Sequence, residues 1–574
     1  MLRFSNGLRC AFLVCFCVSA LSAQQPATDW ATWGGDPERT SWARGESALT
    51  RQNVSGLELL WTAQLDAVPD IRNHYATLTD PLVVQNVATP QGPKSLVFVA
   101  SAKDTVYAVD ADSGEVVWQR SFPNTLEPAH QPTGGCPNAL NATPVIDKEN
   151  GRIYVLTSDG KLRALGLADG EDLMPPTDFV PPYARSWSLN LIDGVVYTAN
   201  ARGCGNIKSH FAAMDVSDSN RPVTRFYTSP GKPNGAWGRA GVVAGPQGIY
   251  TQTADGPYDP AGGRFGESVL ALSKDLRLVD SYTPANWEYL NKKDLDLGSA
   301  SPVVFPFEQW TLLAAAAKEG VIYLLDANQL GGDDHHTPLY LSPRYGNDPV
   351  IFGDAGVWGA LSTWVDPEGE RWLYIPMLGP PAAETAADFP VRHGESVNGN
   401  IMAFQIKLEN DKPVAVPMWR SRDLDQTGMP IIANGVMFVL ANGDRARDEL
   451  ARARREEMMR QRGGAGPQRR GGPRSQRDIE EVVLRAAGAA TPADIFWYTD
   501  QRTEDGQDRG QRFESDVELT HAVLYALDAK TGEEIYSSTD AIDSWNHYGS
   551  LALSNGRLYV STFDARVYAF GIKE

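Results

Sequence analysis

One short pattern occurs three times in this chain and constrains its fold more than any other feature. Residues 95–118 read SLVFVASAKDTVYAVDADSGEVVW, in which two alternating apolar runs flank a tight turn and an Asp/Ser/Gly turn precedes a third run. Alternation with a period of two between such turns predicts three antiparallel strands. Residues 152–173 and 521–536 repeat the pattern. A supersecondary unit that recurs along a chain predicts a stacked or radial repeat architecture.

Weaker copies of the same unit fill most of the remaining chain at intervals of about fifty residues, which suits four strands and their turns. Together they make eight units, marked by residues 97–118, 153–173, 195–215, 249–272, 312–326, 372–419, 436–536 and 558–570. The last unit is short, and an apolar run at residues 57–65 can supply its missing outer strand. Mixing the two ends of the chain in one sheet would close a ring and remove the exposed edge. The sequence therefore predicts an all-β fold, an eight-bladed β-propeller.

The first 23 residues have the features of a secretory signal. Arg3 and Arg9 give a basic start, residues 11–21 are apolar, and residues 20–23 offer small side chains for cleavage. The apolar run is too short to span a bilayer. We therefore expect a periplasmic or secreted protein without a membrane span, with a single propeller domain over residues 24–574.

The charge balance and the cysteines narrow the possible partners and the compartment. The chain has 52 Lys and Arg against 71 Asp and Glu, a formal net charge of −19. Such a surface repels polyanions, so nucleic acid is not expected as a partner. Once the signal is removed, Cys136 and Cys204 are the cysteines that remain. An even number in an oxidising compartment predicts a disulfide.

Residues 444–520 interrupt one repeat unit, between the strand at 436–440 and the strand at 522–527. A Gly/Pro/Arg-rich stretch at 463–477 separates two candidate helices, residues 445–462 and 478–487. One interpretation is a solvated surface insertion. The other is a basic docking arm on an acidic body, which would bind an electron acceptor or another partner. The sequence leaves both open.

The repeat motif, an Asp-Ala-x-Ser/Thr-Gly turn with a Trp four residues after the Gly, resembles the quinoprotein repeat. That repeat builds the propellers of pyrroloquinoline quinone (PQQ) dependent alcohol and polyvinyl-alcohol dehydrogenases. The resemblance covers nearly the whole chain after residue 23 except the insertion. In that family the Trp of the repeat packs between blades, so Trp118 and Trp419 are expected to be core residues. Related propellers without cofactor carry the repeat too, so it specifies the fold rather than the chemistry.

The resemblance also implies residues of an active site. Lys318, before an apolar strand, is similar to the lysine that binds the quinone carbonyls and stabilises their charge during reduction. Asp294 and Asp296 resemble the segment of the catalytic aspartate, which accepts the alcohol proton while a second carboxylate is available to a metal. Trp237 resembles the residue that forms a floor under the planar cofactor. The alternatives are a lysine in a surface turn, solvated acids and a core tryptophan.

Three positions depart from the family pattern. Cys136 stands where many relatives have a vicinal Cys-Cys disulfide against the cofactor. Cys204 stands where the metal-binding Glu is expected, so the resemblance implies a Cys136–Cys204 bond beside the cofactor. Asp255 stands in place of a metal-binding Asn. Asp255, Asp294 and Asp296 would then form a weakened site for Ca²⁺ or a lanthanide.

Two functions are compatible with this sequence. The leading prediction is an exported quinoprotein-like oxidoreductase that oxidises an alcohol or polyol with PQQ. Because the chain lacks the Cys-x-x-Cys-His motif of a c-type haem, electrons would pass to an external acceptor such as a cytochrome c. The alternative is a non-catalytic propeller that binds protein or polysaccharide. The enzymatic prediction requires Trp237, Asp294, Asp296 and Lys318 to converge at the ring axis.

Overall fold

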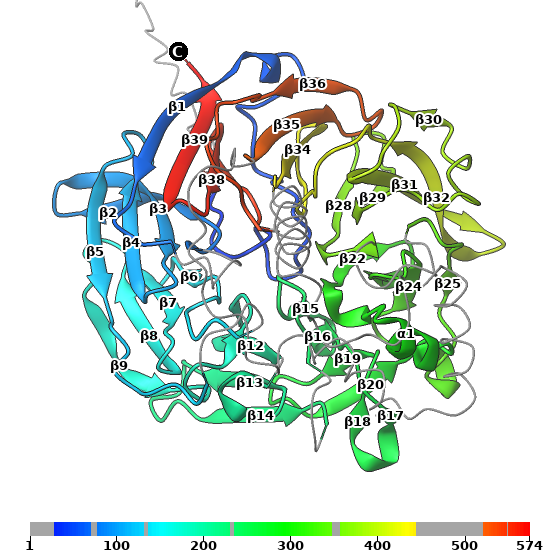
Figure 1. The fold of residues 1–574 in the computed structure, drawn as a ribbon, viewed down its shortest axis with the longest axis horizontal. Coiled ribbons are helices and arrows are strands. Elements are labelled where there is room, and N and C mark those ends of the chain that lie inside the picture. The colour runs from blue at the N-terminus through cyan, green and yellow to red at the C-terminus, as the bar shows by residue number, and fades with distance from the viewer. Residues whose placement is uncertain are drawn as a thin grey trace, which may run out of the picture.

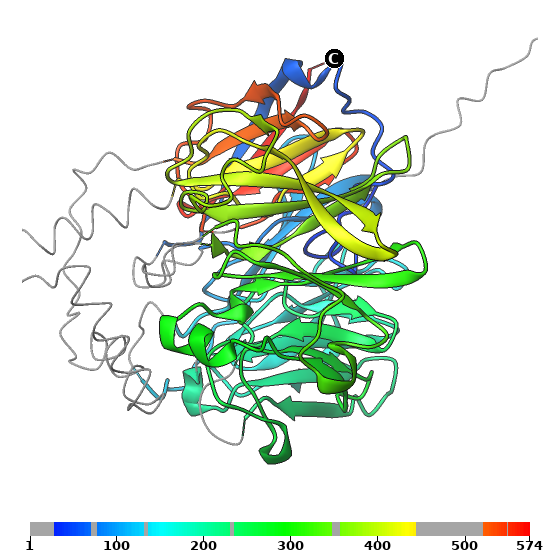
Figure 2. The same cartoon turned by 90° about the vertical axis from the view of Figure 1, so that its right-hand side faces the viewer.

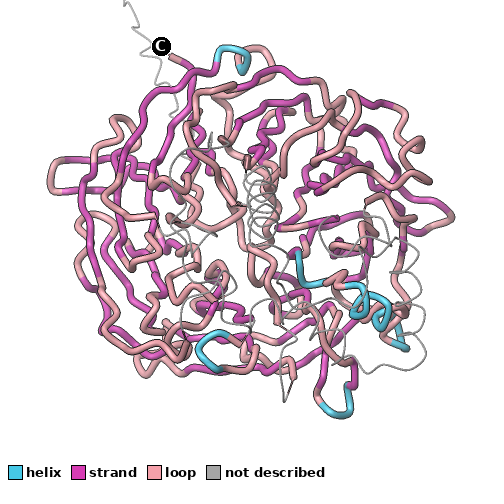
Figure 3. The backbone as a smooth tube through the Cα atoms, in the orientation of Figure 1, coloured by secondary structure: helices cyan, strands magenta, loops and turns pink. Residues whose placement is uncertain are grey.

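The computed structural model describes residues 28–69, 77–130, 136–201, 203–229, 235–346, 356–443, 521–547 and 549–573. Their strands form blades arranged in a ring around a central axis (Figure 1), and Figure 2 shows the same ring from its side. Strands dominate the trace, and the helices are short (Figure 3). The ring is an eight-bladed β-propeller, as the repeats predict.

Each blade is an antiparallel sheet, apart from β30 of blade 6, which pairs parallel with β32, and the first strand in each of the following lists lies on the inner side of its blade (Figure 1). Blades 1 and 2 contain β2 (Leu82–Thr89), β3 (Gly92–Ala100), β4 (Thr105–Asp110) and β5 (Val116–Ser121), then β6 (Val145–Asp147), β7 (Arg152–Leu156), β8 (Lys161–Gly166) and β9 (Asp172–Asp178). Blades 3 and 4 contain β10 (Arg185–Ser186), β11 (Asn190–Ile192), β12 (Val195–Ala201), β13 (His210–Asp215) and β14 (Val223–Tyr227), then β15 (Val243–Gly245), β16 (Gly248–Gln252), β19 (Val269–Leu272) and β20 (Leu278–Tyr282).

The second half of the ring follows the same plan. Blades 5 and 6 contain β22 (Val303–Phe307), β23 (Trp310–Ala316), β24 (Ile322–Asp326) and β25 (Tyr340–Leu341), then β26 (Gly356–Val357), β28 (Ser362–Val365), β29 (Arg371–Leu378), β31 (Gly399–Glu409), β32 (Lys412–Arg420) and β30 (Val391–Arg392). Blades 7 and 8 contain β33 (Ile431–Ala433), β34 (Val436–Ala441), β35 (Val523–Asp528) and β36 (Glu534–Ser537), then β37 (Ala552–Ser554), β38 (Arg557–Ser561), β39 (Arg566–Ile572) and β1 (Leu57–Gln64).

A few elements lie between these strands. The pair β17 (Tyr258–Asp259) and β18 (Arg264–Phe265) forms a small hairpin in blade 4, and β21 (Ala300–Ser301) pairs with β27 (Gly359–Ala360). The helices are α1 (Trp287–Lys293), η1 (Val54–Gly56), η2 (Cys204–Asn206), η3 (Pro260–Gly262), η4 (Leu297–Ser299) and η5 (Gly332–Asp334). No helix among the described ranges is both long enough and apolar enough to cross a bilayer.

The two ends of the chain close the ring in blade 8. Strand β1 pairs antiparallel with β39, from Leu57 opposite Ile572 to Gln64 opposite Arg566. This confirms the predicted closure. Each outer edge strand therefore lies on the outside of a complete ring, and no blade is left without a neighbour.

The repeat tryptophans pack between blades, as expected. The indole Nε1 of Trp118 donates to the Leu167 carbonyl at 2.9 Å, and that of Trp419 donates to the Ala529 carbonyl at 3.1 Å. The turn glycine of the next blade lies under each ring: a Cβ on Gly532 would come within 2.4 Å of the Trp419 ring. Gly532 also has a φ of +76°, so this turn position requires glycine for both reasons.

In each blade the loop before the innermost strand and the turn after the second strand lie at the same edge, because these strands are antiparallel. In blade 5, for example, Val303 at the start of β22 is opposite Ala314 near the end of β23. We call this edge of the ring the front face. The end of β34 and the start of β35, which flank residues 444–520 in the sequence, lie on this face, since these two strands pair directly. The insertion itself and the expected signal at residues 1–23 lie outside the described residues.

Residues 28–46, which we call the axial segment, lie near the axis and contact all eight blades in succession. In Figure 1 this dark blue stretch runs near the centre of the ring. Trp30 forms a β-bridge with Val83 of blade 1, and Glu46 Oε2 accepts a hydrogen bond from Gly556 N of blade 8. Between these two contacts, blades 2 to 7 each donate one hydrogen bond to a carbonyl of the segment. In blade order these are Ile146 N to Ala31 O, Asn190 Nδ2 and Ala244 N to Pro37 O, Val304 N to Glu38 O, Thr363 N to Thr40 O, and Ile432 N to Ser41 O.

Candidate functional site

Four acidic side chains and one lysine gather on the front face of blades 4 and 5; we call this group the acid cluster. Asp255 and Glu267 belong to the long turn between β16 and β19. Asp294 and Asp296 follow α1 and precede η4, in the loop that leads to β22. Lys318 lies in the turn between β23 and β24. Segments from two blades thus supply one site because both turns open on the same face.

Lys318 is the centre of the cluster. Its Nζ donates to Asp296 Oδ2 at 2.7 Å, and to both the carbonyl and Oδ1 of Asp294 at 3.1 Å. Burial lowers the pKa of Lys318, but the charges of Asp296 and Asp294 outweigh this and raise it above its ordinary value. The ammonium is therefore held in its charged form inside the protein.

The two aspartates that contact Lys318 differ in their environments. Burial alone would raise the pKa of Asp296, but the charge of Lys318 and hydrogen bonds to the carboxylate lower it to about 2. Its side chain is only 6% exposed. The Asp294 side chain is 41% exposed. Asp296 is therefore the buried anion of the cluster, and Asp294 is the carboxylate that a molecule on the front face can reach.

Asp255, Glu267 and Asp296 offer carboxylate oxygens that all lie within 4.8 Å of one another. Among the described residues, Asp255 Oδ1 and Glu267 Oε1 are buried without a hydrogen-bond partner. Burial, together with the nearby charge of Asp296, raises the pKa of both Asp255 and Glu267 well above the usual range. Several buried oxygens that the protein does not satisfy are the ligand type that Ca²⁺ and related hard cations require. These residues fit a cation.

Glu267 is a residue that the sequence analysis missed. Its Oε2 accepts a hydrogen bond from the Leu297 amide at 2.6 Å, and its carboxylate lies beside those of Asp255 and Asp296. Its one local signal was an acidic residue two positions before the buried strand β19. The role of Asp294 as a metal ligand stays a prediction.

Trp237 lies beside the cluster. The Lys318 Nζ is 5.2 Å from the centre of the Trp237 ring and 5.2 Å from that of Trp358, and the two indoles meet edge to face at 5.0 Å. Trp358 had no role assigned from the sequence. The structure thus brings Trp237, Asp294, Asp296 and Lys318 together, while the roles of these residues toward a cofactor remain predictions.

Cys136 and Cys204 form a disulfide, with their Cα atoms 5.4 Å apart. The bond links the segment before blade 2 to η2 in the turn between β12 and β13 of blade 3. The predicted pairing is confirmed. Its position against a cofactor stays a prediction.

Comparison with known proteins points to one family. The model of the glucose/ethanol/alcohol dehydrogenase β-propeller domain, named PQQ, matches residues 30–177. A quinohemoprotein alcohol dehydrogenase of Pseudomonas putida is 26% identical over 189 residues, which are 32% of this chain and 23% of the relative. The 1-butanol dehydrogenase (cytochrome c) of Thauera butanivorans is 23% identical over 366 residues, 56% of this chain and 49% of the relative. The chain thus spans from about a quarter to about half of these relatives' lengths.

Solved structures share the fold over nearly the whole chain. A europium-containing methanol dehydrogenase superposes with a TM-score of 0.58 at 13% identity, covering 95% of this chain and 98% of that one. A quinohemoprotein alcohol dehydrogenase of Pseudomonas putida gives a TM-score of 0.53 at 13% identity, with 95% and 80% covered. The resemblance to the PQQ-repeat β-propeller family is confirmed, and the fold is that of the quinoprotein alcohol dehydrogenases.

Proposed function

We propose that this protein is an exported, periplasmic or secreted oxidoreductase that oxidises an alcohol or polyol with PQQ. Ca²⁺ or a lanthanide would assist, and the electrons would pass to an external acceptor such as a cytochrome c. The observation that carries the proposal is the acid cluster: a buried, charged Lys318 beside Trp237, next to carboxylate oxygens without partners. The alcohol dehydrogenase names of the relatives support the reaction class, and the words "cytochrome c" in one of them support the acceptor.

PQQ, when bound, supplies a quinone that accepts a hydride, with both its electrons, from the carbinol carbon. This chain would hold it with a small set of groups. Lys318 would donate to the carbonyl oxygens on which negative charge develops, and a preorganised buried cation is effective in that role. The Trp237 indole would stack on the planar rings. Asp255, Glu267 and Asp296 would hold the cation.

The proton of the alcohol hydroxyl needs a carboxylate within reach. Asp294 suits this role because its side chain is exposed on the front face while Lys318 fixes its orientation. Asp296 suits it less, since a pKa of about 2 makes its carboxylate a weak base. We therefore assign the base to Asp294, and to Asp296 the tasks of anchoring Lys318 and binding the cation.

Binding of PQQ to the purified protein tests this proposal. PQQ would be titrated in the presence of Ca²⁺ or La³⁺ while tryptophan fluorescence is followed, and alcohols would then be screened with an artificial electron acceptor. We expect saturable quenching that weakens in Lys318→Ala and Trp237→Ala, and oxidation that is lost in Asp294→Asn. A folded protein that binds no PQQ with any metal would contradict the proposal and favour a non-catalytic scaffold.

A further inference from the structure

Gln252, the last residue of β16, has a buried side-chain oxygen that no described residue satisfies. The residue is 1% exposed, and its Nε2 donates to the Leu297 carbonyl at 2.7 Å and to the Ala316 carbonyl at 3.3 Å. Because carbonyl oxygens only accept hydrogen bonds, the amide nitrogen must face these two groups and the amide oxygen must face away from them. There, Oε1 is buried without a hydrogen-bond partner among the described residues. Such an oxygen lowers the stability unless a ligand binds it.

Gln252 and Glu267 hold the same residue of the loop after α1. Glu267 Oε2 accepts from Leu297 N at 2.6 Å, and Gln252 Nε2 donates to the carbonyl of that residue. Each side chain thus has one anchored atom and one buried oxygen, Oε1, without a described partner. Asp296 directly precedes Leu297, and its Oδ1 accepts from Asp255 N at 3.2 Å. The unsatisfied oxygen of Gln252 therefore belongs to a side chain beside the carboxylates of the acid cluster.

Close packing holds these groups in place. Gly298 lies so near the segment that follows Gln252 that a Cβ would come within 2.6 Å of Ala254 N. On the other side of this segment, Glu267 N donates to the Ala254 carbonyl at 3.2 Å. The unsatisfied oxygens of Gln252 and Glu267 are therefore positioned before a ligand binds, which reduces the entropy that binding must remove.

The chemistry of these oxygens identifies the kind of ligand. Ca²⁺ and related hard cations take six to eight oxygens and accept amide carbonyls as well as carboxylates. The carboxylates of Asp255, Glu267 and Asp296 already place three acids together. A fourth would add repulsion between like charges, whereas an amide oxygen adds a ligand without charge. The side chain of Cys204, where the family resemblance implies a metal-binding Glu, is held in a disulfide and offers no oxygen.

We propose that Gln252 is a further ligand of the cation site, whose Oε1 binds Ca²⁺ or a lanthanide together with carboxylates of Asp255, Glu267 and Asp296. This inference rests on the proposed function and assigns one more residue to the site described there. The two hydrogen bonds of Nε2 orient the oxygen, so the side chain acts as a fixed neutral ligand. Its removal opens one coordination position, which water fills.

Tb³⁺ bound to the full chain after the signal tests the proposal without any measurement of activity. Its emission can be excited through tryptophan, since Trp237 and Trp358 lie beside Lys318. Emission lifetimes in H₂O and D₂O count the waters on the ion, because O–H vibrations quench the emission and O–D vibrations do not. Gln252→Leu should show about one more bound water than the wild type, and a Tb³⁺ affinity about 10- to 100-fold lower. Competition with Ca²⁺ measures the affinity for that ion.

Gln252→Glu is the second variant, and it keeps an oxygen at this position while adding a charge. It should keep the number of bound waters of the wild type. It should also favour Tb³⁺ over Ca²⁺ more strongly than the wild type does, because the attraction of an added carboxylate grows with the charge of the cation. Thermal unfolding shows that each variant is folded.

Gln85→Leu is the matched control, because Gln85 is a buried glutamine of blade 1 whose Oε1 accepts from Ser95 Oγ. It should bind Tb³⁺ as the wild type does, whereas Asp255→Ala should lose most of the emission and so assign it to this site. An unchanged number of waters in Gln252→Leu overturns the proposal even if the affinity falls, since Gln252 would then act only by positioning Leu297. Gln252→Glu with the ion preference of the wild type also overturns it. Failure of the wild type to bind Tb³⁺ or Ca²⁺ at all overturns the cation site of the proposed function itself.

Discussion

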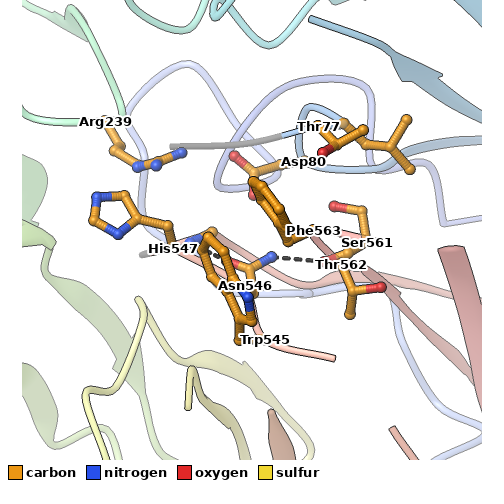
Figure 4. Close-up of a pocket in the computed structure, with 11 residues that line it drawn as sticks. Thr77, Asp80, Arg239, Trp545, Asn546, His547, Ser561, Thr562 and Phe563 are labelled. Atoms are coloured by element: carbon orange, nitrogen blue, oxygen red, sulfur yellow. Dashed lines mark hydrogen bonds between the residues drawn. The ribbon is translucent and has the colours of Figure 1, made fainter. Parts of the chain in front are cut away.

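The acid cluster and the pocket that Asp80 lines near the ring axis (Figure 4) both contain buried carboxylates, but the hydrogen bonding of these carboxylates differs. Asp80 receives hydrogen bonds on both oxygens from Trp33, Thr143 and Ser550. Asp255 Oδ1 and Glu267 Oε1 receive none from the described residues. A buried carboxylate whose oxygens accept hydrogen bonds from the protein stabilises the fold. A buried carboxylate with an oxygen that lacks a donor lowers the stability unless a ligand binds it. The comparison separates a carboxylate that supports the fold, Asp80, from carboxylates that fit a bound cation, Asp255 and Glu267.

Catalysis should depend on the acid cluster, through Asp294. We expect Asp294→Asn to lower alcohol oxidation about 1,000-fold, because a positioned base contributes on this scale. PQQ binding, measured by fluorescence, should change little, since Lys318 and Trp237 are kept. Asp275→Asn, an exposed acid outside both sites, is the control. An Asp294→Asn protein that keeps more than about a tenth of the activity would contradict the assignment of the base.

Stability should respond in opposite directions at the two sites. Asp80→Asn should lower the free energy of unfolding by about 2–4 kcal/mol, because the new amide N–H₂ faces groups that also donate. Glu267→Gln, without metal at pH 7, should leave stability unchanged or raise it by about 1–2 kcal/mol, because a buried acid is replaced by a neutral amide. Urea unfolding of both variants measures the difference. Equal losses in the two proteins would show that the sites do not differ in this way.

A cation should stabilise the protein only through the acid cluster. Ca²⁺ or La³⁺ at about 100 times its Kd should raise the free energy of unfolding by about 2.7 kcal/mol, and a chelator should reverse the effect. Glu267→Gln should lose most of this shift, while Asp80→Asn should keep it despite its lower starting stability. Thermal unfolding at increasing metal concentrations measures both. A full shift in Glu267→Gln would exclude Glu267 as a ligand.

Acid should weaken the Lys318–Asp296 pair within a defined pH window. The pKa of Asp296 is about 2 in the folded protein against an ordinary 3.8. The pair therefore stabilises the protein above pH 3.8, and this contribution of about 2 kcal/mol is lost as the pH falls toward 2. Asp296→Asn should show a shallower loss of stability between pH 4 and pH 2 in urea unfolding. Identical slopes in the two proteins would mean that the pair does not contribute.

The sequence predicted the features that depend on residues close together in the chain. The Asp-Ala-x-Ser/Thr-Gly turns, the inter-blade tryptophans and the closure through residues 57–65 all follow from short-range rules, and the structure confirms them. The two cysteines could be paired because no other cysteine follows the expected signal at residues 1–23. Lys318 and Asp296 could be proposed from a family resemblance of their local segments.

The rest depends on contacts that only the closed ring creates. Glu267 stands in an unremarkable Gly-Glu-Ser stretch; the pairing of β16 with β19 brings it beside Asp255, and the loop after α1 adds Asp296. Asp80 and Arg239 are distant in sequence and meet at the axis because blades 1 and 4 belong to one ring. Residues 28–46 have no periodicity that would reveal their course. In each case the partner is fixed by ring geometry rather than by neighbours in the chain.

The contacts of the axial segment imply an order of events in the folding of the ring. The segment precedes all eight innermost strands in the sequence, yet its partners are distributed over all of the blades, and the bond from Gly556 N to Glu46 spans 510 residues. Contacts of such long range form late in folding. The entropy cost of closing so long a loop is offset only when most of the intervening chain is already folded. A chain that stops before blade 8 leaves this segment without its last partners. The segment can therefore complete its contacts only after blade 8 has formed, so its ordering reports the closure of the whole ring.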